Sequence, residues 1–463
     1  MGGRVAAELG RLATLPLTSL MLSDCHFPPD MLLPLAASLQ HLRLSRCCFC
    51  ACDRCTLRHA YGEECHLPRV AHVLAAMSAL RVLHLVKCRL SPGSLPQALV
   101  ANLTTLNVTD SQVPDLTVDT LLGWGRQLES LSASGWVGGE ADDHDQGEQS
   151  YGAAREGTVG KPPGVDLSHS GDGASSGRVG QHLQELELGR VGGSMAVLQH
   201  AELLLRLRWL DLRAAAVSNK DMPPLASLTS LQGIDLSFCR RISSKALIHL
   251  PPSLITLYAK GLVLGTGPDE GLPHVESSDE EVWRSEDGVF EMTDDDEDED
   301  DGKTEMEGGR GAEDLCGLRQ LTRLEELDLS GTEVTVAALA VESGMLPPSL
   351  RKLHLNSCLG LALGLPEVLP PTLTHLQING CSGLSDGAVE GVARKCGQLR
   401  ELGVVGVQLG DAAAAAIASL RKLQVLGVRA DGKSMLTDHG RAMLYSMPST
   451  VVIVGGRSGW CRE

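Results

Sequence analysis

Two stretches of thirteen residues, "LPPSLRKLHLNSC" at 346–358 and "LPPTLTHLQINGC" at 369–381, carry nearly the same pattern 23 positions apart. Both begin with a leucine and two prolines, place leucine or isoleucine at matching positions, and end in cysteine. Repetition with a period of 20 to 50 residues is typical of proteins built from stacked structural units. We therefore expect the chain to be an array of such units.

The shared kernel is Leu-x-x-Leu-x-Leu-x-x followed by cysteine, asparagine or a small residue, and it occurs fourteen times. We number its positions from one at the first leucine. Ten of the thirteen spacings between kernels are 22 to 26 residues, and the three longer ones indicate insertions. The first leucines are Leu17, Leu39, Leu80, Leu103, Leu128, Leu183, Leu207, Leu231, Leu254, Leu324, Leu350, Leu373, Leu399 and Leu423.

Each kernel has the alternation of a strand with one buried face. In "LTHLQING" the side chains of Leu376 and Ile378 would point inward, while His375, Gln377 and Asn379 would point outward. The strands of successive units should pair in parallel, because one unit of this size cannot bury its apolar face alone.

The segment after this kernel has the spacing of a helix. Its apolar residues recur at intervals of three and four behind a candidate N-cap at Ser385. Paired prolines at 251–252, 347–348 and 370–371 precede kernel leucines, where they would end the helix and extend the chain. The unit is predicted to be strand, turn and helix. The apolar helix positions are Ala388, Val389, Val392, Ala393 and Cys396.

The kernel resembles the leucine-rich repeat, and the copies ending in cysteine resemble the cysteine-containing repeats of F-box/leucine-rich-repeat proteins. The resemblance is clearest in "LQGIDLSFCRRISSKAL" from Leu231 and in residues 373–399. It implies an α/β solenoid, a horseshoe with a parallel β-sheet on the concave face, helices on the convex face and about 14 repeats. It also implies that the kernel cysteines pack their thiols against the backbone of the adjacent coil. These are Cys25, Cys47, Cys88, Cys239, Cys358 and Cys381.

The same resemblance implies a partner protein, and in its most specific form substrate recognition beside the Skp adaptor and cullin scaffold of a ubiquitin ligase. One departure is that repeats begin by Leu17, which leaves no room for an F-box before them.

We divide the chain into an N-terminal cap (1–16) and three repeat blocks separated by insertions. The repeats are expected over 17–137 with a cysteine-rich insertion at 47–68, over 183–264, and over 316–463 including a C-terminal cap. Residues 138–182 are rich in glycine, serine and acids, and residues 265–315 are acidic, so both are predicted to be disordered.

The formal net charge of −18 comes from one insertion. Residues 267–314 hold 21 acids and 3 bases, which leaves 37 of each in the rest of the chain. No basic patch with interleaved aromatics is present, which argues against direct binding of nucleic acid. Neither a membrane span nor a signal peptide is visible, so we expect an intracellular protein, cytoplasmic or nuclear.

The cysteine-rich insertion contains Cys52-x-x-Cys55, the spacing at which two thiolates can hold one zinc ion. Cys50 and Cys65 would complete a set of four ligands. The alternatives are reduced thiols in a surface loop and a redox role. No cofactor other than such a structural zinc is expected.

The acidic insertion contains eight consecutive acids at 294–301, which repel one another. One interpretation is that this segment is a solvated, disordered loop with no partner. The other is that it attracts histones or other basic proteins. Ser277 and Ser278 lie just before acidic residues and resemble sites of acidophilic kinases.

The sequence contains none of the common catalytic motifs, so an enzyme is not expected. The predicted binding surface is instead the open face of the sheet, where positions three, five and seven of successive kernels form columns. Exposed aromatics and arginines often anchor protein interfaces; the alternative is a polar face on which the aromatics coincide by chance. The candidate partner-binding residues are Glu187, Trp209, Asp211, Arg213, Asp235, Phe238, Tyr258, Lys260, Asp328, His354 and Gln377.

Overall fold

The computed structural model describes most of the repeats and little of the insertions. The described residues are 15–25, 27–47, 70–88, 90, 95, 97–111, 127–135, 182–190, 198, 201, 204–263, 315–340, 346–361, 364–429, 435–447, 451–456 and 459–462. The cysteine-rich insertion after Cys47, the candidate zinc ligands Cys50, Cys52, Cys55 and Cys65, the segment 138–181 and the segment 265–314 lie outside them. The predictions made for these segments therefore stay predictions.

The described strands form one sheet in which each strand pairs with its neighbours in the sequence. Neighbours pair in parallel from β1 to β15, and only β16 runs antiparallel, against β15. The strands are β1 (Ser19–Ser23), β2 (His41–Ser45), β3 (Val82–Val86), β4 (Thr105–Asn107), β5 (Ser130–Ser132), β6 (Glu185–Glu187), β7 (Trp209–Asp211), β8 (Gly233–Asp235), β9 (Thr256–Tyr258), β10 (Glu326–Asp328), β11 (Lys352–His354), β12 (His375–Gln377), β13 (Glu401–Gly403), β14 (Val425–Arg429), β15 (Val451–Gly456) and β16 (Gly459–Arg462).

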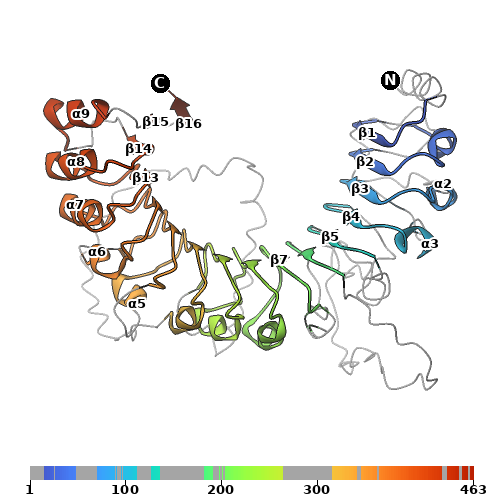
Figure 1. The fold of residues 1–463 in the computed structure, drawn as a ribbon, viewed down its shortest axis with the longest axis horizontal. Helices are drawn as coiled ribbons and strands as arrows, with labels where there is room; N and C mark the ends of the chain where they lie inside the picture. The colour runs from blue at the N-terminus through green and yellow to red at the C-terminus, as the bar shows by residue number, and fades with distance from the viewer. Residues whose placement is uncertain are drawn as a thin grey trace, which may run out of the picture.

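The first fourteen strands each begin two residues after a predicted kernel leucine, so the predicted repeats are confirmed. The strands line the inner side of a curved array and the helices lie on its outer side (Figure 1). β5 pairs directly with β6 and β9 with β10, so neither long insertion interrupts the register of the sheet. The molecule is thus a leucine-rich-repeat solenoid with an open parallel sheet.

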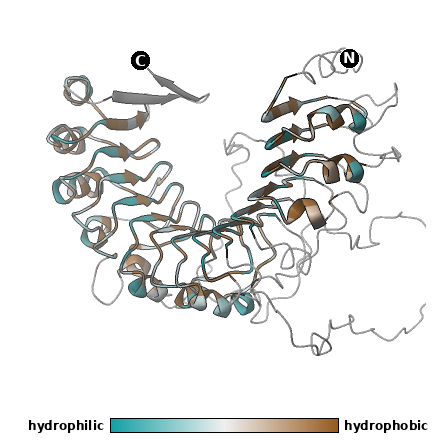
Figure 2. Cartoon of the chain, turned by 45° about the vertical axis from the view of Figure 1, so that its right-hand side comes forward, coloured by the Kyte–Doolittle hydropathy of each residue, from teal (hydrophilic) through white to brown (hydrophobic). Residues whose placement is uncertain are grey.

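The kernel leucines form one continuous core between sheet and helices. Positions one, four and six are almost completely buried in every coil but the first; Leu350, Leu353 and Leu355, for example, are all 0% exposed. Hydrophobic and hydrophilic residues alternate around the coils (Figure 2). Each coil buries its apolar side chains against both neighbours, which is why no coil would be stable alone.

The outer segments are shorter than the predicted helices in much of the solenoid. α7, of ten residues, occupies the 26-residue repeat that begins at Leu373, whereas the 23-residue repeat from Leu231 holds only a 3₁₀ segment. Fewer residues between kernels leave less chain for the outer face. The outer segments are η1 (Pro29–Leu35), α2 (Val70–Ala76), α3 (Gln97–Val100), η4 (Asn219–Asp221), η5 (Pro223–Ser227), η6 (Ser244–His249), η9 (Cys316–Gln320), α5 (Val336–Leu339), α6 (Leu365–Val368), α7 (Asp386–Lys395), α8 (Asp411–Ala418) and α9 (Asp438–Tyr445).

Helix N-termini are capped both within a coil and from the coil before. The predicted N-cap of α7 is confirmed, because the Ser385 side chain accepts a hydrogen bond from the Ala388 amide. α8 begins after Gly410, which has no side chain to act as a cap. Instead Asp386 of the preceding coil accepts hydrogen bonds from the amides of Gly410 and Ala413, at 2.7 and 3.2 Å.

The repeated "LPPSL" and "LPPTL" stretches join consecutive coils. α6 ends at Val368 and the backbone is extended from Leu369, just before the proline pair, as predicted. The hydroxyl between the prolines and the kernel leucine donates to the carbonyl of the previous kernel's first leucine. This bond joins Ser253 to Leu231, Ser349 to Leu324 and Thr372 to Leu350, at 2.7 to 3.1 Å.

The kernel cysteines at position nine fasten the turn after the strand. Five of the six thiols donate to the carbonyl of position six in the adjacent coil, as in Cys381 to Leu355 at 2.9 Å and Cys239 to Leu212 at 3.0 Å. Burial raises the pKa of both thiols to about 12. Ser111 takes the same place in its own repeat and donates to Leu85. The packing role that the resemblance implies is therefore confirmed.

Position eight adopts the left-handed conformation in all thirteen kernels whose position eight is described. This regularity was not predicted. Left-handed backbone costs an L-residue about 1–2 kcal/mol, and only glycine adopts it freely. Five of the thirteen are glycines, and the other eight, such as Ala214 with φ +53° and Phe238 with φ +62°, keep a side chain.

Candidate protein-binding face

Positions three and five of the kernels form two columns that run across the inner face of the sheet. The in-register pairs run from Glu187 through Asp211, Asp235, Tyr258, Asp328 and His354 to Gln377, which confirms that the predicted position-five residues are neighbours on consecutive strands. Position three runs in parallel through Glu185, Trp209, Gly233, Thr256, Glu326, Lys352 and His375.

Trp209 and Tyr258 form an aromatic pair that spans three strands. Their ring centroids are 6.0 Å apart and their planes meet at 67°, an edge-to-face arrangement. Trp209 reaches Tyr258 across β8, where the facing residue is Gly233. A Cβ added at Gly233 would collide with Cε3 and Cζ3 of the indole. The pair therefore depends on a glycine that sequence reasoning did not single out.

The phenol of Tyr258 lies among acidic side chains. Its hydroxyl donates to Glu326 Oε1 at 2.9 Å, and Glu326 accepts a further bond from Lys352 Nζ at 2.9 Å. Burial, the hydrogen bond to Glu326 and the nearby charges of Asp328 and Asp235 raise the pKa of Tyr258 to about 12. Burial opposes ionisation of Glu326, but the bonds from Lys352 and Tyr258 lower its pKa overall.

The aspartates at position five are less exposed than the open-face prediction implied. Asp211, Asp235 and Asp328 are only 5 to 7% exposed. One carboxylate oxygen of each accepts the amide of the residue two positions on, at 2.8 to 2.9 Å. This local turn draws the side chain back onto its own backbone. These aspartates therefore mainly stabilise the turns that border the face, and they expose little of their carboxylates on it.

The cations at position seven pair with these aspartates. Arg213 contacts Asp211 at 2.8 Å and Asp235 at 3.3 Å, and Lys260 contacts Asp328 at 3.3 Å. Burial raises the pKa of Asp235, with a further contribution from Asp211. Both cations stay about half exposed, with side-chain accessibilities of 56% and 45%. About half of each side chain is therefore accessible on the open face of the sheet.

The remaining predicted residues extend the face at its edges. His354 is half-buried beside Glu326, and Gln377 donates to Glu401 Oε1 at 2.7 Å. Phe238 does not lie in the inner columns, because it occupies position eight in the turn after β8 and stacks over Gly261. It is 38% exposed. The prediction that three aromatics share one surface on neighbouring strands is therefore corrected to a pair, with Phe238 at the rim.

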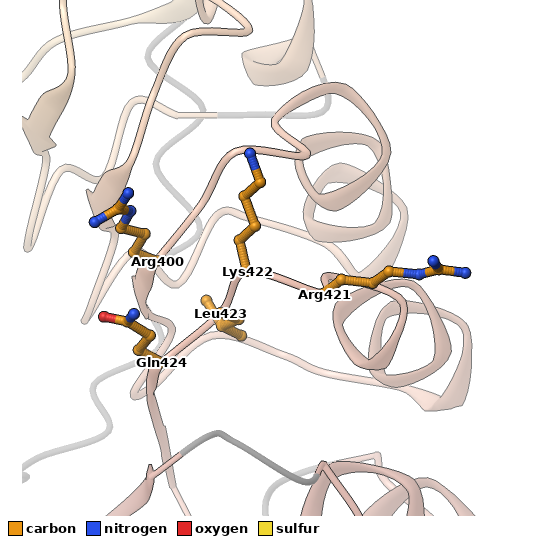
Figure 3. A pocket seen from close by; sticks show the side chains of 5 residues that line it. All are labelled: Arg400, Arg421, Lys422, Leu423 and Gln424. Atoms are coloured by element: carbon orange, nitrogen blue, oxygen red, sulfur yellow. The ribbon is translucent and has the colours of Figure 1, made fainter.

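A shallow hollow of about 320 Å³ lies near the chain entry to β13 and β14, away from the aromatic pair. Its lining residues are Arg400, Arg421, Lys422, Leu423 and Gln424. The charged ends of Arg400, Arg421 and Lys422 point in different directions (Figure 3). They do not converge on a common ligand position.

Within the described residues, no group of three or more His, Cys, Asp or Glu side chains could hold a metal ion. No described helix is long and apolar enough to cross a membrane.

The fold and the kernels together define the class of fold: a leucine-rich-repeat solenoid. No protein-family model matches the sequence, and no curated protein is detectably similar to it. Solved structures with a similar trace include an internalin from Listeria monocytogenes str. 4b F2365, at 13% identity and TM-score 0.41, covering 98% of this chain and 94% of that one.

Two further structures are a leucine-rich-repeat protein from Leptospira interrogans and the mouse RP105/MD-1 complex. The first has 15% identity and TM-score 0.47, covering 96% of this chain and 91% of that one. The second has 12% identity and TM-score 0.46, covering 94% and 66% respectively. Because all three TM-scores are below 0.5, the class rests on the repeats and the sheet topology of this chain itself.

Proposed function

We propose that the protein is a non-catalytic scaffold that binds a partner protein on the concave face of β6 to β12. The observation that carries this proposal is the Trp209–Tyr258 pair, a partly exposed aromatic surface held in place by Gly233 and Glu326. Aromatic side chains with fixed conformations lose little entropy on binding and are frequent energetic anchors of interfaces. Half-exposed cations at Arg213 and Lys260 flank the pair.

In its more specific form, the proposal is substrate recognition in an ubiquitin-ligase complex with the Skp adaptor and a cullin. It is supported by the resemblance of the cysteine-ending kernels to those of F-box/leucine-rich-repeat proteins. The thiol-to-carbonyl bonds of Cys239 and Cys381 fit that subfamily, although they concern packing and not partner choice.

A second candidate function is binding of histones or other basic proteins by the acids at 294–301. The sequence alone favours it, since eight consecutive acids create a strong local potential. It predicts binding that falls steeply with salt concentration and that does not depend on Trp209.

The test is quantitative affinity purification of the tagged protein from its own cells, in parallel with a Trp209→Ala/Tyr258→Ala variant. The matched control is Arg394→Ala, at a side chain 75% exposed on α7 on the outer side. We expect some proteins to be recovered with the unchanged protein and with the Arg394→Ala control but lost with the aromatic variant. Skp and cullin among the recovered proteins would support the ligase form. Identical partner sets for all three proteins would contradict binding by the concave face.

A further inference from the structure

Acidic residues on the inner face are confined to one part of the solenoid. Positions three, five and seven of β1 to β5 carry none. The same positions of the repeats from β6 to β13 carry seven acids and three bases. The acids are Glu185, Glu187, Asp211, Asp235, Glu326, Asp328 and Glu401, and the bases are Arg213, Lys260 and Lys352. The acidic part also contains the aromatic pair.

The three bases are already paired with carboxylates on this face. Arg213 pairs with Asp211 and Asp235, Lys260 with Asp328, and Lys352 with Glu326. Among the described residues, no salt bridge involves Glu185 or Glu187, although the charge of Glu187 acts on the nearby Arg213. Glu185 is exposed and Glu187 is half-buried. Two of the four unbalanced negative charges of the face therefore lie on β6; one more is shared by Asp211 and Asp235, and the fourth is on Glu401.

These two glutamates stand beside Trp209. Glu185 is in register with Trp209, and Glu187 with Asp211, on the neighbouring strand. Adjacent strands lie about 4.8 Å apart, so Glu185 and Glu187 stand on the strand directly beside that of Trp209. Tyr258 lies on the opposite side of Trp209, beyond Gly233. The indole thus has the ring of Tyr258 on one side, and the strand on its other side carries Glu185 and Glu187.

We infer that Glu185, Glu187 and Trp209 form the seat for an arginine side chain of an extended basic segment of the partner protein. This inference rests on the proposed function, because it specifies the chemistry of the same face. A guanidinium stacks favourably on an indole and pairs with carboxylates through two parallel hydrogen bonds. An acidic segment would meet the uncompensated charge of β6 and be repelled.

The experiment measures capture of fluorescent nonapeptide pools by the full-length protein. Each pool is random except for its central residue, which is arginine, its neutral isostere citrulline, or glutamate. We expect about tenfold greater capture of the arginine pool than of the citrulline pool, since a stacked and paired cation contributes roughly that factor. The glutamate pool should be captured least.

Three variants locate the preference. Glu185→Gln/Glu187→Gln removes the charge without changing shape, and Trp209→Phe keeps an aromatic ring of smaller area. Glu401→Gln is the matched control, because Glu401 also occupies position three but lies on β13. Loss of the arginine preference in the double variant, its reduction in Trp209→Phe and its retention in Glu401→Gln would support the seat.

Other outcomes would overturn it. Equal capture of all pools, with capture reduced by Trp209→Phe, would contradict the arginine seat and leave the concave face as a binding surface. An arginine preference that survives both variants, but disappears when the acids at 294–301 are replaced by their amides, would contradict the seat and the proposed function together. Absence of any arginine preference in the unchanged protein would also reject the seat.

Discussion

Trp209 lies over Gly233, its in-register neighbour on the next strand, and fills the space that any larger residue at 233 would need. The indole reaches Tyr258 only because this space is empty of side chain. A single glycine thus links the local structure of β8 to the arrangement of the whole aromatic pair.

Gly233→Ala is expected to displace the indole and separate the aromatic pair. Forcing a methyl group into an occupied position typically lowers the free energy of unfolding by about 1–3 kcal/mol. Urea denaturation measures this loss, and capture of the arginine peptide pool should fall with it. Gly397→Ala is the control, since nothing lies within 4 Å of an added Cβ there. Equal stability of the two variants would show that Trp209 does not need this space.

Ala214→Gly is expected to stabilise the protein, unlike most substitutions by glycine. Ala214 has φ +53°, and glycine removes a conformational cost of about 1 kcal/mol. The reverse change at the same kernel position, Gly331→Ala, with φ +68°, should destabilise by a similar amount. Ala216→Gly, outside the left-handed turn, should lower stability, because glycine increases the conformational entropy of the unfolded chain. Parallel urea titrations would reveal the opposite signs, and a loss for Ala214→Gly would contradict the argument.

Asp386→Ala is expected to weaken the start of α8, a helix in the next coil. The carboxylate accepts two amides there, and loss of an N-cap acceptor costs about 1 kcal/mol. Asp386→Asn keeps an acceptor oxygen and should recover most of the stability. Hydrogen exchange should report faster exchange at Gly410 and Ala413 in the alanine variant only. Unchanged protection of these amides would exclude the cross-coil cap.

The buried kernel thiols are expected to make the fold sensitive to alkaline pH. The pKa of Cys239 and Cys381 rises from the ordinary value of 9.0 to about 12 in the folded protein. Below pH 9 both states hold the proton and the stabilisation is fully present. Above pH 9 the unfolded chain releases protons while the folded one retains them, so stability falls as the pH rises toward 12.

Urea titrations between pH 8 and 11 measure this slope. Cys381→Ser keeps the hydrogen bond to the Leu355 carbonyl, as Ser111 does in its own repeat, but does not ionise in this range. Its slope should therefore be shallower than that of the unchanged protein. In the folded state, Cys239 and Cys381 should also resist iodoacetamide at pH 8, because the thiolate is the reactive form. Rapid modification of both would contradict their burial.

The order and position of the fourteen kernel strands could be predicted from the sequence because each depends on local alternation and on a period of 22 to 26 residues. The N-cap at Ser385 and the proline stops were equally local. The arrangement of the inner face of the sheet was predicted less completely. Its columns were correct, but the burial of Asp211 and the place of Phe238 were not, because both depend on the turn after the strand and not on strand alternation.

The sequence by itself determined the repeat, the direction of each kernel leucine and the class of fold, since stacked coils have one way to bury such a periodic apolar stripe. Only the tertiary structure decided which outward residues meet. Tyr258 and Glu326 are 68 positions apart and yet hydrogen-bonded, because β9 and β10 pair across the whole acidic insertion. The contact of Trp209 with Tyr258 arises in the same way. It needs three strands from three repeats, because the indole crosses β8 at Gly233, where there is no side chain in its way.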